Sequence, residues 1–261
     1  MKEKTILVLS DTHCAHRAGL THPSYQYKRD TDCSTRKKFG DMQRCQWNWF
    51  EKEIKSIGTI DVALFNGDLV EGDGKRNKGA ELLATDENDQ SDMAVKALGI
   101  IQSKEYHIVN GTWSHSTNVE RQISKFFNCE SLNQVWLDVN GLIIHARHKI
   151  GGASVPHGRS TAILKESLWN LINAEKGFDP MKANIIIRSH LHKAHDCRGV
   201  LPNQRLFITP SLQGLTDYGE KECHGGIDIG FLVFRIKNER VWTWEEHTMD
   251  IKFLAPEVIK V

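Results

Sequence analysis

Short apolar runs without polar alternation recur along the chain and are typical of strands buried on both faces. Four such runs cover residues 5–10, 61–66, 106–109 and 184–188. Two further segments flank Asn140-Gly141, a favoured two-residue turn, and predict a hairpin of residues 134–138 and 142–147. Closing strands of antiparallel character are predicted at residues 205–209, 229–236 and 241–247.

Apolar residues at helical spacing separate several of these runs. Residues 41–57 carry apolar side chains such as Met42 and Trp49 at this spacing and end near Gly58, which predicts a helix. Further helices are predicted at residues 92–103, 118–127 and 161–174. Residues 14–40 and 75–89 lack periodicity and are predicted to be loops. The first loop carries the basic residues Lys28, Arg29, Arg36, Lys37 and Lys38.

Strands that alternate with helices predict an α/β fold. With 261 residues, 39% of them hydrophobic and 26% charged, the chain is expected to form one soluble globular domain over residues 1–261. The 34 basic and 33 acidic residues nearly cancel, so no global field draws the protein toward nucleic acid or an anionic membrane.

The pattern shows neither a membrane span nor an export signal. No apolar run approaches the roughly 20 residues needed to cross a bilayer, and the first run leads into Asp11 and His13 instead of a signal-peptide cleavage site. The six cysteines have neither a CxxC nor a zinc-ribbon spacing. Reduced thiols in a cytoplasmic protein with no membrane partner are therefore expected.

Asp, His or Asn follows five of the predicted strands at the carboxyl end, where α/β sheets bind their ligands. These residues are Asp11 and His13, Asp68, residues 110–115, His145 and His148, and His190 and His192. Carboxylates combined with imidazoles favour Mn, Fe, Zn or Ni. An Asp-x-His pair places two donors on one side of an extended segment, and a carboxylate such as Asp68 can bridge two ions. The pattern thus indicates a binuclear site for phosphoryl chemistry.

The order of these motifs resembles that of the calcineurin-like metallophosphoesterase superfamily, whose pattern is DxH, GD, GNH with an acid, a lone H, and GHxH. Asp11-Thr12-His13 and Gly67-Asp68 match the first two blocks, and Ser189-His190-Leu191-His192 matches the last with Ser for Gly. The third block departs, because Thr112 stands where the family has Asn and two extra residues precede His115. That is similar to the G-T-x-x-H variant of phage-type members. The resemblance implies two mixed sheets flanked by helices in a four-layer α/β/β/α sandwich.

The resemblance also implies a set of site residues and a reaction. One divalent metal would be held by Asp11, His13, Asp68 and His192. The second would be held by Asp68, His148, His190 and Thr112, or a water in place of Thr112. Family members hydrolyse phosphate esters with a hydroxide that bridges the two metals, and His115 takes the place of the residue near the leaving group.

Several alternatives stay open at the level of the sequence. His145 is a rival to His148 as ligand, and Asn110 is a rival to Thr112. Candidates for contact with substrate phosphate are Arg159, His195 and His157. A phosphodiesterase or nuclease, acting on a nucleic acid or nucleotide, is favoured because the loop at 14–40 is basic and holds two tyrosines. The alternatives are a phosphomonoesterase for a small molecule and a degenerate member that acts as a protein-binding scaffold.

Overall fold

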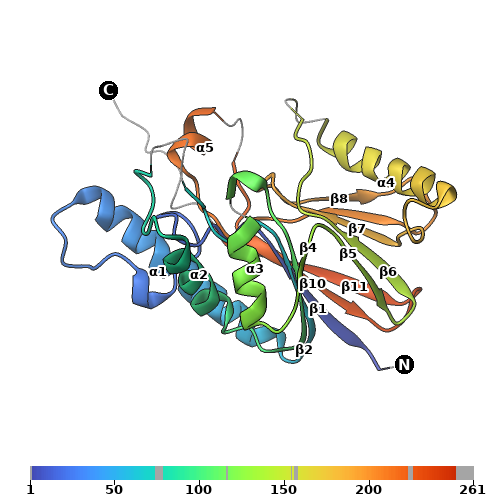
Figure 1. The fold of residues 1–261 in the computed structure, drawn as a ribbon, viewed down its shortest axis with the longest axis horizontal. Coiled ribbons are helices and arrows are strands. Elements are labelled where there is room, and N and C mark those ends of the chain that lie inside the picture. Colours follow the sequence, from blue (N-terminus) through green and yellow to red (C-terminus); the bar gives the residue numbers. More distant parts are fainter. Residues whose placement is uncertain are drawn as a thin grey trace.

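Two β-sheets lie face to face in the computed structural model, and helices cover the outer face of each sheet (Figure 1). The structure describes residues 2–250 apart from 74–78, 116, 154, 156–157 and 223–225. The layers follow the order helices, sheet, sheet, helix. This is the four-layer α/β sandwich predicted from the sequence.

The first sheet has the strand order β11-β10-β1-β2-β3-β4. Its parallel part consists of β1 (Lys4–Leu9), β2 (Ile60–Asn66), β3 (Ser103–Val109) and β4 (Ser131–Leu132). Its antiparallel edge consists of β10 (Gly230–Ile236) and β11 (Trp242–Thr248). The closing strands predicted near the end of the chain are therefore confirmed for these two.

The second sheet has the strand order β5-β6-β7-β9-β8. Its strands are β5 (Val135–Val139), β6 (Leu142–Ala146), β7 (Ile185–Arg188), β8 (His195–Arg198) and β9 (Arg205–Ile208). The hairpin around Asn140 and Gly141 is confirmed. Strand β9 pairs in parallel with β7 and antiparallel with β8, so its antiparallel character is confirmed on one side only. Strand β8 escaped prediction because it is a polar edge strand with no apolar run.

Successive residues of β1 serve two different cores. Ile6 and Val8 point between the sheets and pack in one cluster with Ile144 of β6. Leu7 and Leu9 point the other way and pack against the helices. Because both faces are buried, the strand sequence is apolar without alternation.

The helices divide unequally between the two outer faces. The first sheet is covered by α1 (Ser34–Ile57), α2 (Glu87–Leu98) and α3 (Thr117–Phe126). The second sheet is covered by α4 (Arg159–Lys176). The short elements are α5 (Asp217–Glu222) and the 3-10 turns η1 (Pro23–Tyr25) and η3 (Trp113–His115). None of the described helices is long and apolar enough to cross a membrane.

Two helix boundaries correct the sequence prediction. Helix α1 begins at Ser34 instead of residue 41, because Phe39 packs with Met42 and Ala18 in a small separate core. Helix α2 begins at Glu87 and ends at Leu98, since the Asp86 side chain caps its amino terminus. The predicted loops at 14–40 and 75–89 are consequently shorter, and the predicted helix at 92–103 starts too late and runs too far.

Candidate metal centre

The carboxyl ends of strands from both sheets meet at one edge of the sandwich. Asp11 and His13 follow β1, Asp68 follows β2, His148 follows β6, and His190 and His192 follow β7. The donor atoms of these residues form two overlapping groups, in each of which all donors lie within 4.8 Å of one another. The structure therefore brings together six of the donors predicted from widely separated parts of the sequence.

The first group contains Asp11, Asp68, His148 and His190. His148 Nε2 lies 2.9 Å from Asp68 Oδ2 and 3.8 Å from Asp11 Oδ1. His190 Nδ1 lies 3.7 Å from Asp68 Oδ2. Both carboxylates and both imidazoles thus face one small volume.

The second group contains Asp11, His13 and His192. Asp11 Oδ1 lies 3.2 Å from His192 Nε2 and 3.9 Å from His13 Nε2. Asp11 is therefore the residue common to the two groups, whereas the family resemblance assigns the shared position to Asp68. The same oxygen, Oδ1, faces the histidines of both groups.

The other carboxylate oxygens are held by hydrogen bonds. Ser10 Oγ and the His190 backbone N–H donate to Asp11 Oδ2 at 2.6 and 3.2 Å. The Thr112 backbone N–H and hydroxyl donate to Asp68 Oδ1 at 2.6 and 3.1 Å. These bonds orient both carboxylates, and they place Thr112 against Asp68 at the position predicted for the third block.

The backbone is left-handed at five of the donors. The φ angles are 50° at Asp11, 41° at His13, 52° at Asp68, 79° at His190 and 55° at His192. Such angles are uncommon outside glycine and cluster at functional sites. They also correct one argument from the sequence, because Asp11 and His13 reach the same volume through tight turns and not from an extended segment.

Two glycines allow the loops to approach this closely. A Cβ on Gly67 would lie 2.7 Å from the His148 ring, and a Cβ on Gly111 would lie 2.1 Å from Asp68 Oδ1. Ser189, which replaces the glycine of the family's last block, is accommodated because its hydroxyl accepts hydrogen bonds from Asn66 and Thr209. The departure at Ser189 therefore leaves the site geometry intact.

The donor set fits divalent cations. Asp11 Oδ1 and His13 Nε2 are buried and make no hydrogen bond within the described part of the chain, and buried His148 Nε2 has only its ion pairs with the two carboxylates. Buried polar atoms without partners are costly, so their convergence calls for a ligand. His148 Nδ1 donates to the Asn66 carbonyl at 2.7 Å, which directs Nε2 into the site. Mixed carboxylate and imidazole donors suit Mn, Fe, Zn or Ni.

Opposed charges dominate the electrostatics of the site. Burial alone would raise the pKa of Asp11 and of Asp68, but the neighbouring histidines outweigh it and lower both. Burial would lower the pKa of His148, but Asp11 and Asp68 raise it to about 9. Without a metal, His148 therefore carries a proton at neutral pH, and a cation would replace that proton.

Glu71 is a supporting residue that the sequence did not single out. Its carboxylate accepts a hydrogen bond from His13 Nδ1 at 2.8 Å, and its backbone carbonyl accepts one from His115 Nδ1 at 2.7 Å. Burial would raise the pKa of Glu71, but the bond from His13 lowers it to about 2. Its position three residues after Asp68, on the same loop, is the one signal available in the sequence.

Glu120 is a second supporting residue without a motif. It is buried on α3 and accepts hydrogen bonds from the backbone N–H groups of Gly111 and Leu69 at 2.6 and 3.3 Å. Burial, reinforced by the charge of Asp68, raises its pKa to about 8. In the sequence, Glu120 stands out only as an acidic residue that follows apolar Val119 on a helix face expected to be buried.

His115 lies at the edge of the donor groups. Its ring meets the His13 ring edge-on, with the centroids 4.7 Å apart. Since Nδ1 donates to the Glu71 carbonyl, Nε2 is left to interact with a ligand. His115 forms a third group of donors with His13 and Glu71, which shares His13 with the second group but does not contain Asp11.

The rival candidate His145 does not join these groups. His145 is buried behind the site, stacks on Trp136 with centroids 4.0 Å apart and bonds to Gln134 and Arg188. Burial and Arg188 lower its pKa to about 2, which keeps it neutral. Asn110 Nδ2 donates to Asn133, while Asn110 Oδ1 is buried without a hydrogen bond among the described residues, so Asn110 stays a candidate ligand beside Thr112.

Of the predicted phosphate-contacting residues, the structure describes Arg159 and His195. Arg159 is exposed at the start of α4. His195 bonds to Ser160 at 2.8 Å. His157 falls outside the described residues.

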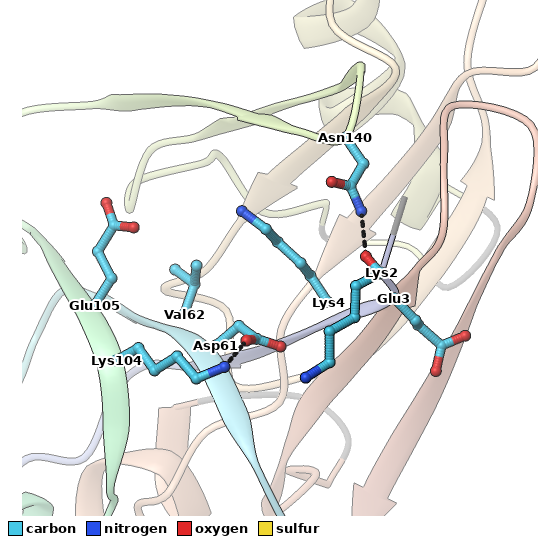
Figure 2. Close-up of a pocket in the computed structure, with 8 residues that line it drawn as sticks. All are labelled: Lys2, Glu3, Lys4, Asp61, Val62, Lys104, Glu105 and Asn140. Atoms are coloured by element: carbon cyan, nitrogen blue, oxygen red, sulfur yellow. Dashed lines mark hydrogen bonds and ion pairs between the residues drawn. The ribbon is translucent and has the colours of Figure 1, made fainter.

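A separate pocket of about 450 Å³ lies at the opposite, amino-terminal ends of β1 and β2 (Figure 2). Its charges balance in number, because three lysines (Lys2, Lys4 and Lys104) and three acids (Glu3, Asp61 and Glu105) line it. Lys104 also pairs with Asp61 at 2.6 Å. This pocket holds none of the candidate donors, and the chemistry lies at the other end of the sheets.

Comparison with known proteins gives likenesses of fold only. No protein-family model and no curated protein matches the sequence. Vps29 from Entamoeba histolytica, solved with Zn²⁺, is 15% identical with a TM-score of 0.43, and the match covers 94% of this chain and 98% of that one. A novel archaeal phosphodiesterase is 9% identical with a TM-score of 0.48, and the match covers 93% of this chain and 99% of that one. The purple acid phosphatase PPD1 from yellow lupin is 9% identical with a TM-score of 0.48, and the match covers 94% of this chain and 52% of that one.

Two of these structures are a phosphodiesterase and a phosphatase by name. At such low similarity, a function can be inferred only from the residues of this chain. Those residues define an α/β sandwich with a candidate metal centre of Asp and His at one edge.

Proposed function

We propose that this protein is a hydrolase of phosphate esters that depends on two divalent cations. One observation carries the proposal: the buried, unpartnered oxygen Asp11 Oδ1 is shared by two groups of donors. His13 and His192 would hold one ion with Asp11, and the group of Asp68, His148 and His190 would hold the other. The order of the motifs, similar to that of the metallophosphoesterases and of their phage-type variant, supports the same set of donors, although it makes Asp68 the shared ligand.

The side chains around the donors are suited to this reaction. Divalent ions bound there supply Lewis acidity, which stabilises charge on phosphoryl oxygens and lowers the pKa of a water molecule. His115 Nε2 is held toward the site by the bond from Nδ1 to the Glu71 carbonyl, and it delivers a proton to the departing oxygen. Glu71 orients His13 in the same way, so one loop positions both imidazoles.

We favour a phosphodiester over a phosphomonoester as substrate. A monoester carries a second negative charge, which arginine commonly binds. Arg17 is engaged by Glu81, and Arg147 and Arg188 are both engaged by Glu166. Arg159, the arginine that the sequence offers as a phosphate contact, is exposed at the start of α4.

The basic loop contributes less to this preference than the sequence suggested. Lys37 and Lys38 belong to α1, and the first part of the loop, from Cys14 to Leu20, is largely buried. In Figure 1 the blue segment before α1 extends to the left, away from the ends of the strands. The five described cysteines are free, in keeping with a reducing, cytoplasmic setting.

The test combines metal analysis with two model substrates. Purified protein should contain two ions per chain after loading with Mn²⁺, Zn²⁺ or Ni²⁺, and it should hydrolyse bis-p-nitrophenyl phosphate faster than p-nitrophenyl phosphate. Asp11→Asn should abolish hydrolysis, whereas Asp92→Asn, at an exposed position on α2, should not. Faster hydrolysis of the monoester would favour the phosphomonoesterase alternative. A metal-loaded protein that hydrolyses neither ester would favour the scaffold.

A further inference from the structure

Trp113 is the most exposed large hydrophobic residue of the described chain, with 89% of its surface accessible. It belongs to η3, the turn that makes the third block longer than the family pattern. Thr112, directly before it, is hydrogen-bonded to Asp68, and His115 follows two residues later. The indole therefore stands on a turn whose two ends both touch the candidate metal centre.

The other tryptophans show how unusual this placement is. Those with a ring neighbour in the structure are Trp47, Trp49, Trp136, Trp242 and Trp244. Within the described residues, Trp113 packs against no ring, and its large apolar surface faces solvent. Trp169, on α4, is also exposed, at 57%, but none of the donor residues lies on that helix. Exposure of an indole forfeits the favourable burial that such a side chain usually has.

The turn under Trp113 is fixed at several points. The His115 N–H donates to the Thr112 carbonyl at 2.9 Å, and the Gly111 N–H donates to buried Glu120 at 2.6 Å. Together with the bonds from Thr112 to Asp68 and from His115 to Glu71, these contacts hold the backbone of the turn relative to the donors. Because the backbone of this turn is already held in place, less conformational entropy is lost when a ligand stacks on the indole of Trp113.

We propose that Trp113 stacks on a nucleobase next to the reacting phosphate, so that the substrate is a nucleotide diester with an accessible base. This inference rests on the proposed function and specifies its substrate class. An exposed indole stacks on any base because every base has a flat π-face. Lys149, exposed directly after His148, adds a positive charge beside the same site and suits a substrate with several phosphates.

The test compares a dithymidine phosphodiester with an analogue in which both bases are replaced by hydrogen. Trp113→Ala should raise the KM for the dinucleotide about 5- to 150-fold, the range for loss of one base–aromatic stack. It should leave kcat, metal content and the KM for the abasic analogue unchanged. Trp113→Phe should retain part of the effect, and Trp169→Ala is the matched control that should behave as wild type.

Two results would overturn the inference while leaving the proposed function in place. One is equal KM values of wild type for the dinucleotide and the abasic analogue. The other is an equal loss on both substrates in Trp113→Ala and in Trp113→Phe, which would indicate a structural role.

A lack of any hydrolysis, including that of bis-p-nitrophenyl phosphate, would instead reject the proposed function. Binding of labelled oligothymidylate and of an abasic strand of equal length then decides the stacking proposal. Weaker binding of oligothymidylate alone by Trp113→Ala supports it, and unchanged binding rejects it.

Discussion

Asp11 has two oxygens in different environments, and this asymmetry explains its place in the candidate metal centre. Oδ2 accepts hydrogen bonds from Ser10 and from the His190 backbone, while Oδ1 faces His13, His148 and His192. Asp68 has one oxygen held by Thr112 and one directed at His148 and His190. The free oxygen of Asp11 thus faces histidines of both donor groups, whereas that of Asp68 faces histidines of the first group only.

This difference predicts unequal effects of two substitutions. Asp11→Asn should remove both bound ions, because the residue serves both groups. Asp68→Asn should remove one ion and leave the other with Asp11, His13 and His192. Elemental analysis of metal-loaded variants measures the stoichiometry directly. Loss of both ions in Asp68→Asn together with retention of one in Asp11→Asn would instead make Asp68 the shared ligand, as the family resemblance implies.

His115 permits a prediction on the leaving group. His115→Ala should retain its metals, since the residue belongs to neither group that contains Asp11. Its rate on a diester with an alkoxide leaving group should fall roughly 10²- to 10⁴-fold, the range of general acid catalysis. The rate on bis-p-nitrophenyl phosphate should fall much less, because p-nitrophenolate departs without a proton.

Steady-state rates of His115→Ala on both substrates provide the measurement. The acid role requires a loss that depends on the leaving group. Equal losses, or a loss of metal, would show that His115 instead shapes the site through its contact with the Glu71 carbonyl.

Helix α3 braces two loops of the site through one side chain. Glu120 accepts hydrogen bonds from Leu69, in the loop after β2, and from Gly111, in the loop after β3. Both loops carry residues of the candidate centre, Asp68 and Thr112. An element outside the sheets thus fixes the spacing of the strand ends, which is a role for α3 beyond covering the first sheet.

The raised pKa of Glu120 predicts how the stability of metal-free protein depends on pH. Folded Glu120 binds its proton up to about pH 8, whereas the carboxyl of the unfolded chain releases it near 4.5. The stabilising contribution is complete below pH 4.5 and is lost as the pH rises to about 8. The free energy of unfolding of wild type should therefore fall, relative to Glu120→Gln, by roughly 1 kcal/mol per pH unit in this window.

Urea unfolding in the presence of a chelator at pH 5, 6.5 and 8 measures this difference. Glu130→Gln is the matched control, because Glu130 is exposed after α3 and should follow wild type at every pH. Parallel stability curves for wild type and Glu120→Gln would mean that Glu120 is already ionised in the folded protein. The hydrogen bonds from Leu69 and Gly111 would then outweigh its burial.

At the scale of the molecule, the candidate centre joins the two sheets. Asp11, His13 and Asp68 follow strands of the first sheet, whereas His148, His190 and His192 follow strands of the second. Metal binding should therefore stabilise the sandwich as a whole. An ion at 100 times its dissociation constant adds about 2.7 kcal/mol, which corresponds to a rise in Tm of roughly 5–10 °C for a domain of this size.

Scanning calorimetry with Mn²⁺ and then with a chelator tests this expectation. A single cooperative transition that moves upward with metal is expected, and Asp11→Asn should show no metal-dependent shift. Two separate transitions would contradict the prediction of one domain over residues 1–261. An unchanged Tm in metal-saturated wild type would contradict binding between the sheets.

The sequence by itself determined most of the strands, the burial of both faces of the first one and the order of the donors. Ile6 to Leu9 had to be a strand buried on both faces, because an unbroken apolar run of this length satisfies both cores at once. Once such strands are parallel, their carboxyl ends share an edge. The convergence of Asp11 with Asp68 was therefore predictable from local signals, whereas that of His190, on the other sheet, also depended on how the two sheets pack.

Only the tertiary structure decided which atoms face one another. The contacts of Asp11 with His192, of Glu71 with His13 and of Glu120 with Gly111 depend on left-handed turns and on packing between distant segments. The position of Trp113 in water is likewise a property of the folded surface. Hydrophobic periodicity reports burial along one element, whereas the direction of a single carboxylate oxygen is fixed by hydrogen bonds that the folded chain alone supplies.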